Sequence, residues 1–467
     1  MKIKLENLGA IKDADFDLSK RLIVFCGPNN SGKTYAAFII YALTKSSIQY
    51  LRSKSQNAFI QQLIKNQKAN FKIQAKEIWK FRELELEKVK KSLDSIYGIS
   101  EDIQKSLFDD FSIQVNQTEK EFEESILQMN FKNDIKINNT LIHLEKDTSS
   151  KEIQLSLKEK TVQKKDIEVL ELFLRSKLYS LIAFYPFTSS HILPVERNSI
   201  YTFSKELSIQ KQEFLDRAQE LSSKNSNRDP FHWLLRRSTR YPMPIRDGLE
   251  IAEDLNNYSK TKTDFFKLAE EIENEILQGK MVINKEGEVQ YSSSKAKAKR
   301  IPIHLTASIV KTLSSLVFYL KYIASHNELI IIDEPELNLH PNNQVYLTRI
   351  FAKLINNGFR ILISTHSDYV IREINNLIMA SSIKDGVIDK ARELGYDETM
   401  KLPHSKVGAY LFNFKNKSSR KVNVESIEVT ETGFDVKTID SAIDRLNETS
   451  EELFHVIKYG LPDELLN

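Results

Sequence analysis

The sequence predicts a mixed α/β fold in which short buried strands present polar motifs at their carboxyl ends. Three runs carry this prediction, at Leu22–Cys26, Leu329–Ile332 and Phe359–Ile363, and all their residues are apolar except Arg360. Short, continuously apolar runs are typical of strands buried on both faces of a sheet. Two further strands are predicted at 2–5 and 14–18, directly before the first of these runs, and a helix at 35–44 after it.

The first buried strand leads directly into a motif of the form G-x-x-x-x-G-K-[ST]. Its glycines let backbone N–H groups turn inward around a polyphosphate, and the following helix points its positive N-terminus at the same anion. Lys33 is expected to reach the β- and γ-phosphates, and Thr34 to give a hydroxyl to Mg²⁺. A chance match is rare in a chain with only 13 glycines in 467 residues. The predicted nucleotide-binding residues are Gly27, Pro28, Asn29, Asn30, Ser31, Gly32, Lys33 and Thr34.

Polar residues that suit hydrolysis follow the second and third buried strands. Asp333 is predicted to hold Mg²⁺ together with Thr34, and Glu334 to polarise the water that attacks the γ-phosphate. The third strand ends in STHSD, which places His366 where an imidazole contacts the γ-phosphate. A single histidine at a strand end is usually a satisfied polar residue, but the two companion motifs favour a catalytic role. The predicted cofactors are therefore ATP and Mg²⁺.

Composition limits the possible partners and the compartment. The 67 Lys and Arg nearly balance the 64 Asp and Glu, so any DNA binding must come from local patches and not from bulk charge. A single cysteine, Cys26, excludes an internal disulfide and fits a reducing compartment. No apolar run approaches the ~20 residues of a membrane span, and the N-terminus lacks the apolar segment of a signal peptide. We expect a cytoplasmic protein with no membrane partner.

The order of elements predicts five segments. The nucleotide-binding core is expected at 1–44 and 300–375, interrupted by a Lys-, Glu- and Gln-rich helical insertion at 45–111. Alternating apolar residues predict an antiparallel β subdomain at 112–164, and a helical lobe follows at 165–299. Residues 376–467 are expected to form a C-terminal α+β extension with a hairpin but without a nuclease motif.

Three motifs resemble those of a known group of ATPases. They are GPNNSGKT at 27–34, IIIDEPELNLHP at 330–341 and STHSDY at 364–369. Together they resemble the ABC-type ATPase heads of the OLD, RecF and SMC group, and most of all the prokaryotic defence-associated AAA-family ATPases of the PARIS and Septu type. The resemblance implies an ABC-type P-loop NTPase head, a mixed sheet flanked by helices, with an antiparallel β subdomain and a large helical insertion. It also implies an enzyme that converts ATP and water to ADP and phosphate.

The resemblance implies residues that complete the site across a dimer. In such heads two protomers pack face to face, and a signature-motif serine reaches the partner's ATP. Ser308 is the candidate here, although Ile309 stands where a glycine is usual. The segment LPVER at 193–197 resembles the LPAER-like segment of defence-type ATPases, so Glu196 and Arg197 are expected to line the interlobe cleft. The D-loop region holds Asn338 and His340, for which an interface role and a helix-capping turn both stay open.

Two functions from different classes follow from this resemblance. The first is a sensor or regulatory ATPase of an antiviral defence system, a homodimer or higher homo-oligomer that controls a separate effector, either a nuclease or a toxin. The alternative is a RecF- or SMC-like ATPase of DNA repair or chromosome maintenance that clamps DNA on ATP binding. A transporter ATPase is disfavoured because the insertion is large. Basic clusters that can contact DNA or remain solvated are Arg236, Arg237, Arg240 and Arg246 with nearby aromatic residues, and Lys295, Lys297, Lys299 and Arg300.

Overall fold

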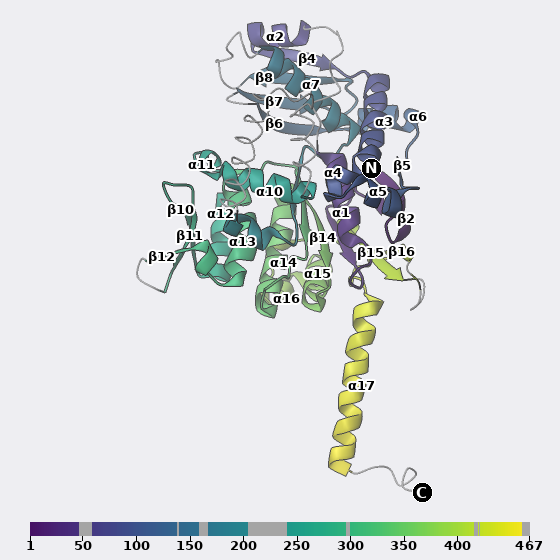
Figure 1. Cartoon of the computed structure of the whole chain (residues 1–467), viewed down its shortest axis with the longest axis vertical. Coiled ribbons are helices and arrows are strands. Elements are labelled where there is room, and N and C mark those ends of the chain that lie inside the picture. The colour runs from purple at the N-terminus through teal and green to yellow at the C-terminus, as the bar shows by residue number, and fades with distance from the viewer. Residues whose placement is uncertain are drawn as a thin grey trace, which may run out of the picture.

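The computed structural model describes residues 1–45, 58–137, 140–157, 167–203, 241–295, 299–414, 419 and 421–459. A mixed sheet runs through the centre of the molecule, with a smaller sheet and helices at one end and a single long helix at the other (Figure 1). The predicted α/β fold class, with helices around a mixed sheet and a separate antiparallel sheet, is confirmed. Among the described residues, every helix is too short or too polar to cross a membrane.

The central sheet has nine strands in the order β5-β1-β2-β16-β15-β3-β14-β13-β9. Strands β3, β14, β13 and β9 run parallel to one another, and β15 runs parallel to β3. The strands are β1 (Lys2–Leu8), β2 (Ile11–Asp17), β3 (Leu22–Cys26), β5 (Ser112–Val115), β9 (Ser190–Leu193), β13 (Leu329–Asp333), β14 (Arg360–Thr365), β15 (Val407–Phe414) and β16 (Val422–Ile427). The five strands predicted at 2–5, 14–18, 22–26, 329–332 and 359–363 are all present.

The register of the parallel strands brings the three sequence motifs to one edge of the sheet. Cys26 at the end of β3 pairs with Thr365 of β14, and Ser364 pairs with Asp333 at the end of β13. All residues of β3 and β13 are buried, as expected for strands covered on both faces. The loops that follow β3, β13 and β14 therefore emerge side by side.

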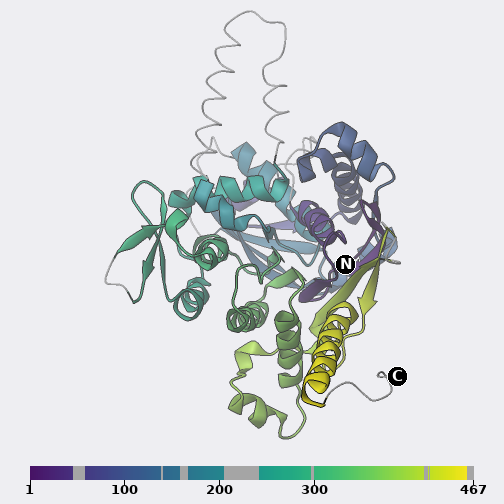
Figure 2. The same ribbon diagram turned by 60° about the horizontal axis from the view of Figure 1, so that its bottom comes forward.

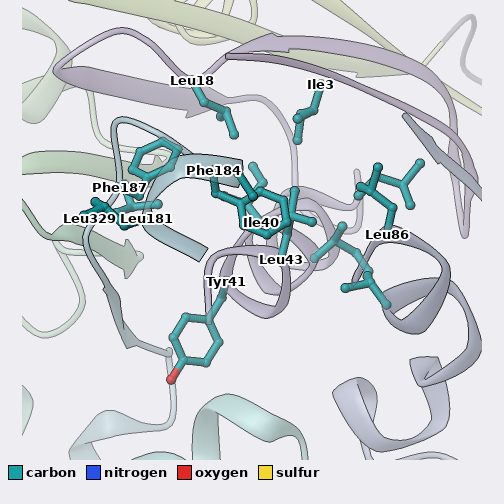
Figure 3. Close-up of a cluster of buried hydrophobic side chains, with 14 of the residues drawn as sticks. Ile3, Leu18, Ile40, Tyr41, Leu43, Leu86, Leu181, Phe184, Phe187 and Leu329 are labelled. Atoms are coloured by element: carbon teal, nitrogen blue, oxygen red, sulfur yellow. The ribbon is translucent and has the colours of Figure 1, made fainter. Parts of the chain in front are cut away.

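The sheet separates two hydrophobic cores. Alternate residues of β3 point to opposite faces, so Ile23 and Phe25 join one core while Val24 joins the other. The first core holds α1 (Lys33–Thr44), whose Ile40 gathers with Ile3 and Phe184 (Figure 3). The second core holds α13 (Ser308–Tyr322), α14 (Pro341–Asn356) and α15 (Asp368–Ala380).

The segment between α1 and α7 differs from the prediction by one additional strand and one additional helix. Within the predicted helical insertion at 45–111, residues 68–72 form a strand, because KANFK alternates buried and exposed side chains. Within the predicted β subdomain at 112–164, Ser112–Val115 joins β1 in the central sheet and residues 119–128 form a helix with a capping box. The elements are α2 (Ala58–Asn66), β4 (Lys68–Lys72), α3 (Ala75–Lys91), α4 (Leu93–Tyr97), α5 (Glu101–Phe108), α6 (Glu119–Gln128), β6 (Phe131–Ile137), β7 (Thr140–Lys146) and β8 (Glu152–Leu157).

The remaining antiparallel strands form two small sheets. Strands β4, β8, β7 and β6 pair in that order, so the predicted antiparallel meander is present from residue 131. Within the predicted helical lobe at 165–299, β10 and β11 form a hairpin that belongs to a three-stranded sheet of β10, β11 and β12. The further elements between residues 167 and 302 include α7 (Ile167–Ala183), α10 (Met243–Glu253), α11 (Leu255–Tyr258), α12 (Phe266–Ile272), a π-helical turn (Glu273–Leu277), β10 (Gly279–Ile283), β11 (Val289–Ser293) and β12 (Arg300–Pro302).

The C-terminal segment contributes to the central sheet. Its hairpin, β15 and β16, lies between β3 and β2 and connects the first two strands of the chain to the parallel half of the sheet. The predicted boundary at residue 376 therefore crosses a single sheet, and the division into five domains stays a prediction. The segment also contains α16 (Val387–Glu393) and α17 (Lys437–Tyr459). Helix α17 extends away from the other described elements in Figure 1, and the turned view of Figure 2 shows it foreshortened.

Candidate active site

The phosphate loop connects the end of β3 to the start of α1. Its first glycine, Gly27, has φ 138°, and a Cβ atom there would lie 2.2 Å from the carbonyl oxygen of Phe412 in β15. Gly32 has φ 90°, and its Cβ would lie 2.9 Å from a side-chain carbon of Ile11 in β2. Both positions therefore need glycine, because a Cβ atom would clash with a neighbouring strand and because φ is positive.

Lys33 lies inside the curve of this loop. Its Nζ donates hydrogen bonds to the carbonyl oxygens of Gly27 and Pro28, at 3.0 and 2.9 Å. Burial lowers the pKa of Lys33, while Asp333 and Glu334 act in the opposite direction and favour its charged form. A buried ammonium group is therefore held beside two carboxylates, in the position from which a phosphate-loop lysine contacts phosphate.

Thr34 and Asp333 meet where the sequence predicts a magnesium site. The Thr34 hydroxyl donates to one carboxylate oxygen of Asp333 at 2.7 Å, and the Ser364 hydroxyl donates to the other. Asp333 is only 1% exposed. This set of oxygen ligands suits Mg²⁺, which usually takes one or two carboxylates and completes its shell with phosphate and water. Among the described residues, no group of three or more His, Cys, Asp or Glu side chains forms a denser metal site.

Glu334 and His366 face each other beside these ligands. The Nε2 atom of His366 lies 3.7 Å from Oε1 of Glu334. Burial raises the pKa of Glu334, and the neighbouring Asp333 raises it further. Burial also lowers the pKa of His366, as does the charge of Lys33. The pair therefore combines a carboxylate of increased basicity with an imidazole that stays neutral at neutral pH.

The backbone at Glu334 has an unusual conformation. Its φ is 48°, in the left-handed region that glutamate seldom adopts, and its N–H donates to the carbonyl oxygen of Ser364 at 2.9 Å. Strained residues of this kind persist where the surrounding structure holds them, and they cluster at functional sites. The left-handed turn begins immediately after the last paired residue of β13, Asp333.

Arg197 holds this turn from behind. Its guanidinium donates to the carbonyl oxygens of Asp333 and Glu334, both at 2.6 Å, and to that of Pro194 at 2.9 Å. The side chain is 2% exposed, and burial lowers its pKa to about 10. The sequence predicts that Glu196 and Arg197 both line a cleft, whereas the structure buries Arg197 under the site and leaves only Glu196 exposed.

Glu336 is a further site residue that the sequence analysis did not single out. Its carboxylate accepts hydrogen bonds from the Thr365 hydroxyl at 2.9 Å and from the His366 backbone N–H at 2.7 Å. It thus ties the loop after β13 to the loop after β14 and fixes the backbone of His366. Its position in the run DEPE, two residues after Glu334, is the signal from which it is recognisable.

The residues expected at a dimer interface lie on the surface near this edge. Ser308 is exposed at the N-terminus of α13. The Asn338 side chain donates a hydrogen bond at 3.1 Å to the hydroxyl of Thr312, which lies on α13. His340 caps α14 by accepting from the N–H of Asn342 at 3.4 Å, which agrees with the helix-capping interpretation. Completion of the site by a partner's Ser308 stays a prediction.

One edge of the parallel half of the sheet carries a phosphate loop, a paired hydroxyl and carboxylate, and a second carboxylate beside an imidazole. Together these features define a nucleotide-binding site of the P-loop class. The family comparison agrees, since the model described as "AAA ATPase domain" matches residues 1–371. The chain therefore belongs to the AAA ATPase domain family. The match ends before β15, β16 and α17.

Three of the similar solved structures are heads of SMC proteins. An SMC head bound to the C-winged helix domain of ScpA is 12% identical, with a TM-score of 0.35, covering 92% of this chain and 98% of that one. The SMC head domain from Thermotoga maritima is 10% identical, with a TM-score of 0.28 and the same coverage. The Pyrococcus furiosus SMC head with an extended coiled coil, bound to the C-terminal domain of ScpA, is 12% identical, with a TM-score of 0.32, covering 96% and 98%. Among curated proteins, the search found no match.

Proposed function

We propose that this chain is a magnesium-dependent ATPase that converts ATP and water to ADP and phosphate. The single observation that supports the proposal most strongly is the meeting of Lys33, Thr34, Asp333, Glu334 and His366 at one sheet edge. These residues come from three chain segments: Thr34 and Asp333 are 299 positions apart in the sequence, and His366 follows Glu334 by 32 positions. Their convergence follows from the parallel register of β3, β14 and β13.

Each residue has a distinct proposed task. Lys33 and the loop N–H groups bind the phosphates, and Thr34 and Asp333 hold Mg²⁺, which neutralises phosphate charge when bound. Glu334 accepts a proton from the attacking water, and its raised pKa makes it a better base than an ordinary glutamate. Neutral His366 orients the γ-phosphate by a hydrogen bond. Arg197 and Glu336 position Glu334 and His366 through their backbone atoms.

We further propose that two heads pair with ATP between them and that this pairing controls a separate effector in antiviral defence. Two observations support this role. Ser308 is exposed at a helix N-terminus, which favours contact with a partner's phosphate. The sequence of residues 376–467 contains no acidic DxD strand-end pair and no Cys/His cluster of the kind that nucleases use.

The alternative function, an ATPase that clamps DNA on ATP binding, would use the same ATP cycle. Most of the arginine cluster that could support it, Arg236, Arg237 and Arg240, falls outside the described residues, while Arg246 is occupied by hydrogen bonds to Ser95 at 2.7 and 2.9 Å. DNA binding that requires ATP and weakens with salt would favour the clamp.

Phosphate release by the purified chain tests the ATPase proposal. We expect turnover with Mg²⁺ and ATP, and loss of turnover with retained ATP binding in Glu334→Gln. Glu253→Gln, on the exposed surface of α10, is the matched control and should behave as wild type. Equal turnover by wild type and Glu334→Gln would refute the assigned base. Multiple-turnover cleavage of DNA, RNA or protein by the chain alone would refute the need for a separate effector.

A further inference from the structure

The most exposed element of the described structure is α17. It spans the 23 residues Lys437–Tyr459 and extends well beyond the other described elements (Figure 1). It begins directly after Val436, which is buried in the second hydrophobic core. The helix is therefore anchored at its first residue while most of its length lies in solvent.

One stripe of this helix is apolar although it faces water. Leu446, Leu453 and Ile457 are 66%, 60% and 85% exposed. With Ile443 they follow the spacing of three, seven and four residues that places side chains along one helical seam. Ser450 occupies the remaining position of the seam, halfway between Ile443 and Ile457. Isolated helices are marginal in water, so such a stripe is most stable when another apolar surface covers it.

The charges of α17 argue against a membrane or a nucleic acid as its partner. Residues 437–459 contain five carboxylates and only three Lys or Arg side chains. Helices that lie on anionic membranes or bind phosphate backbones are instead rich in Lys and Arg. An acidic helix with an apolar seam fits a protein surface.

A second copy of the same helix complements this seam. The positions on either side of it carry no charge, so two copies meet without repulsion between like charges; they are Asn447, Thr449, Phe454 and Val456. In heptad terms Ile443 and Ile457 occupy a positions and Leu446 and Leu453 occupy d positions. Isoleucine at a with leucine at d favours two parallel strands, and a polar residue at a central a position fixes their register.

We propose that α17 is a self-association helix through which two copies of the chain pair in parallel, without nucleotide. The inference goes beyond the proposed ATPase function, because it needs neither ATP nor Ser308. A helix of 23 residues is about 34 Å long, so the contact is smaller than a standard stable interface. Pairing through α17 is therefore reversible, and it raises the effective concentration at which the two heads meet.

Cysteine cross-linking tests the parallel arrangement. The chain has a single cysteine, Cys26, which is buried, so a new exposed cysteine reports alone. In a parallel pair the two copies of Leu453→Cys face each other within disulfide distance and give a covalent dimer under mild oxidation. Glu448→Cys lies on the opposite side of the helix and is the matched control, for which we expect far less dimer. Equal cross-linking by the two variants, or none by Leu453→Cys, would overturn the parallel pair.

Sedimentation of the full-length chain without nucleotide tests the contact itself. We expect a concentration-dependent dimer in the wild type and a monomer in Leu446→Asp, while Glu448→Ala behaves as wild type. Because Leu446 lies on a solvent-exposed helix, its substitution leaves the hydrophobic cores intact. A wild-type chain that is monomeric at every concentration would overturn the proposal. So would a dimer that appears only with ATP and persists in Leu446→Asp, although that result would support the head-to-head contact.

Discussion

Replacing Arg197 by Met should reduce turnover far more than it reduces ATP binding. Arg197 lies under the site and donates to the carbonyl oxygens of Asp333 and Glu334 at 2.6 Å. Methionine keeps much of the volume but leaves these buried carbonyls without their charged donor. A hydrogen bond to a charged group contributes about 1.5–3 kcal/mol, so the loss of two such bonds should destabilise the local turn by about 3–6 kcal/mol.

We expect the loss of turnover because Arg197 holds the backbone of Glu334 in a strained conformation. Glu334 has φ 48°, and without the guanidinium its backbone is free to relax toward an ordinary conformation, which moves the carboxylate. A displacement of about 1 Å at a reacting group costs about 100-fold in rate. We therefore expect kcat to fall about 100-fold. Lys33 and Thr34 are untouched by the change, so the Kd for ATP should change little.

The assay compares kcat from phosphate release with the Kd for a fluorescent ATP analogue. Arg349→Met is the matched control, since Arg349 pairs with Glu373 at 2.6 Å between α14 and α15, away from the phosphate loop. It should lower the free energy of unfolding but leave kcat of the folded enzyme unchanged. The reasoning about Arg197 is refuted if Arg197→Met keeps kcat within about twofold of wild type, or if kcat and ATP affinity fall together.

Three further predictions test other parts of the site. Activity should decline on acidification at a pH above the ordinary glutamate range, because burial and Asp333 raise the pKa of Glu334 and protonation removes the base. The pKa of His366 is lowered, so the variant His366→Asn should show this decline at the same pH in its pH–rate profile. Gly27→Ala should abolish ATP binding, because the new Cβ would lie 2.2 Å from the Phe412 carbonyl oxygen. Gly386 also has a positive φ, but a Cβ there would have no atom within 4 Å, so Gly386→Ala should keep ATP binding and lower the free energy of unfolding in denaturant by only about 1–2 kcal/mol. Glu334→Gln with ATP, but not with ADP, should protect Ser308 or cross-link it to the phosphate loop of a second copy, and Ser308→Arg should remove this signal; a signal unaffected by nucleotide and by Ser308→Arg would contradict the shared site.

The sequence predicts those parts of the site that local chemistry determines. The phosphate loop is recognisable because its spacing is fixed by the geometry of a bound polyphosphate, and Asp333 and Glu334 because they directly follow an apolar strand. The positioning residues are harder to predict. Arg197 acts through backbone carbonyls 136 and 137 positions away, and no local pattern indicates such a contact.

The fold was predictable to a similar extent. Strands buried on both faces are evident from their composition, whereas short strands such as Lys68–Lys72 lie within a Lys- and Gln-rich run that favours helix. The hairpin of β15 and β16 was recognised, but not its place in the central sheet, because strand order depends on contacts between distant segments. Pairing between β15 and β3 joins residues almost 400 positions apart, for example Val407 and Leu22.

The insertion of this hairpin into the central sheet has a consequence for synthesis of the protein. The phosphate loop is made within the first 34 residues, but the strand that packs against Gly27 contains Phe412. Strands β1 and β2 likewise reach the parallel half of the sheet only through β16 and β15. A chain still being translated therefore carries the whole nucleotide motif without its supporting strand. Formation of the nucleotide site is thereby delayed until the segment that contains Phe412 has left the ribosome.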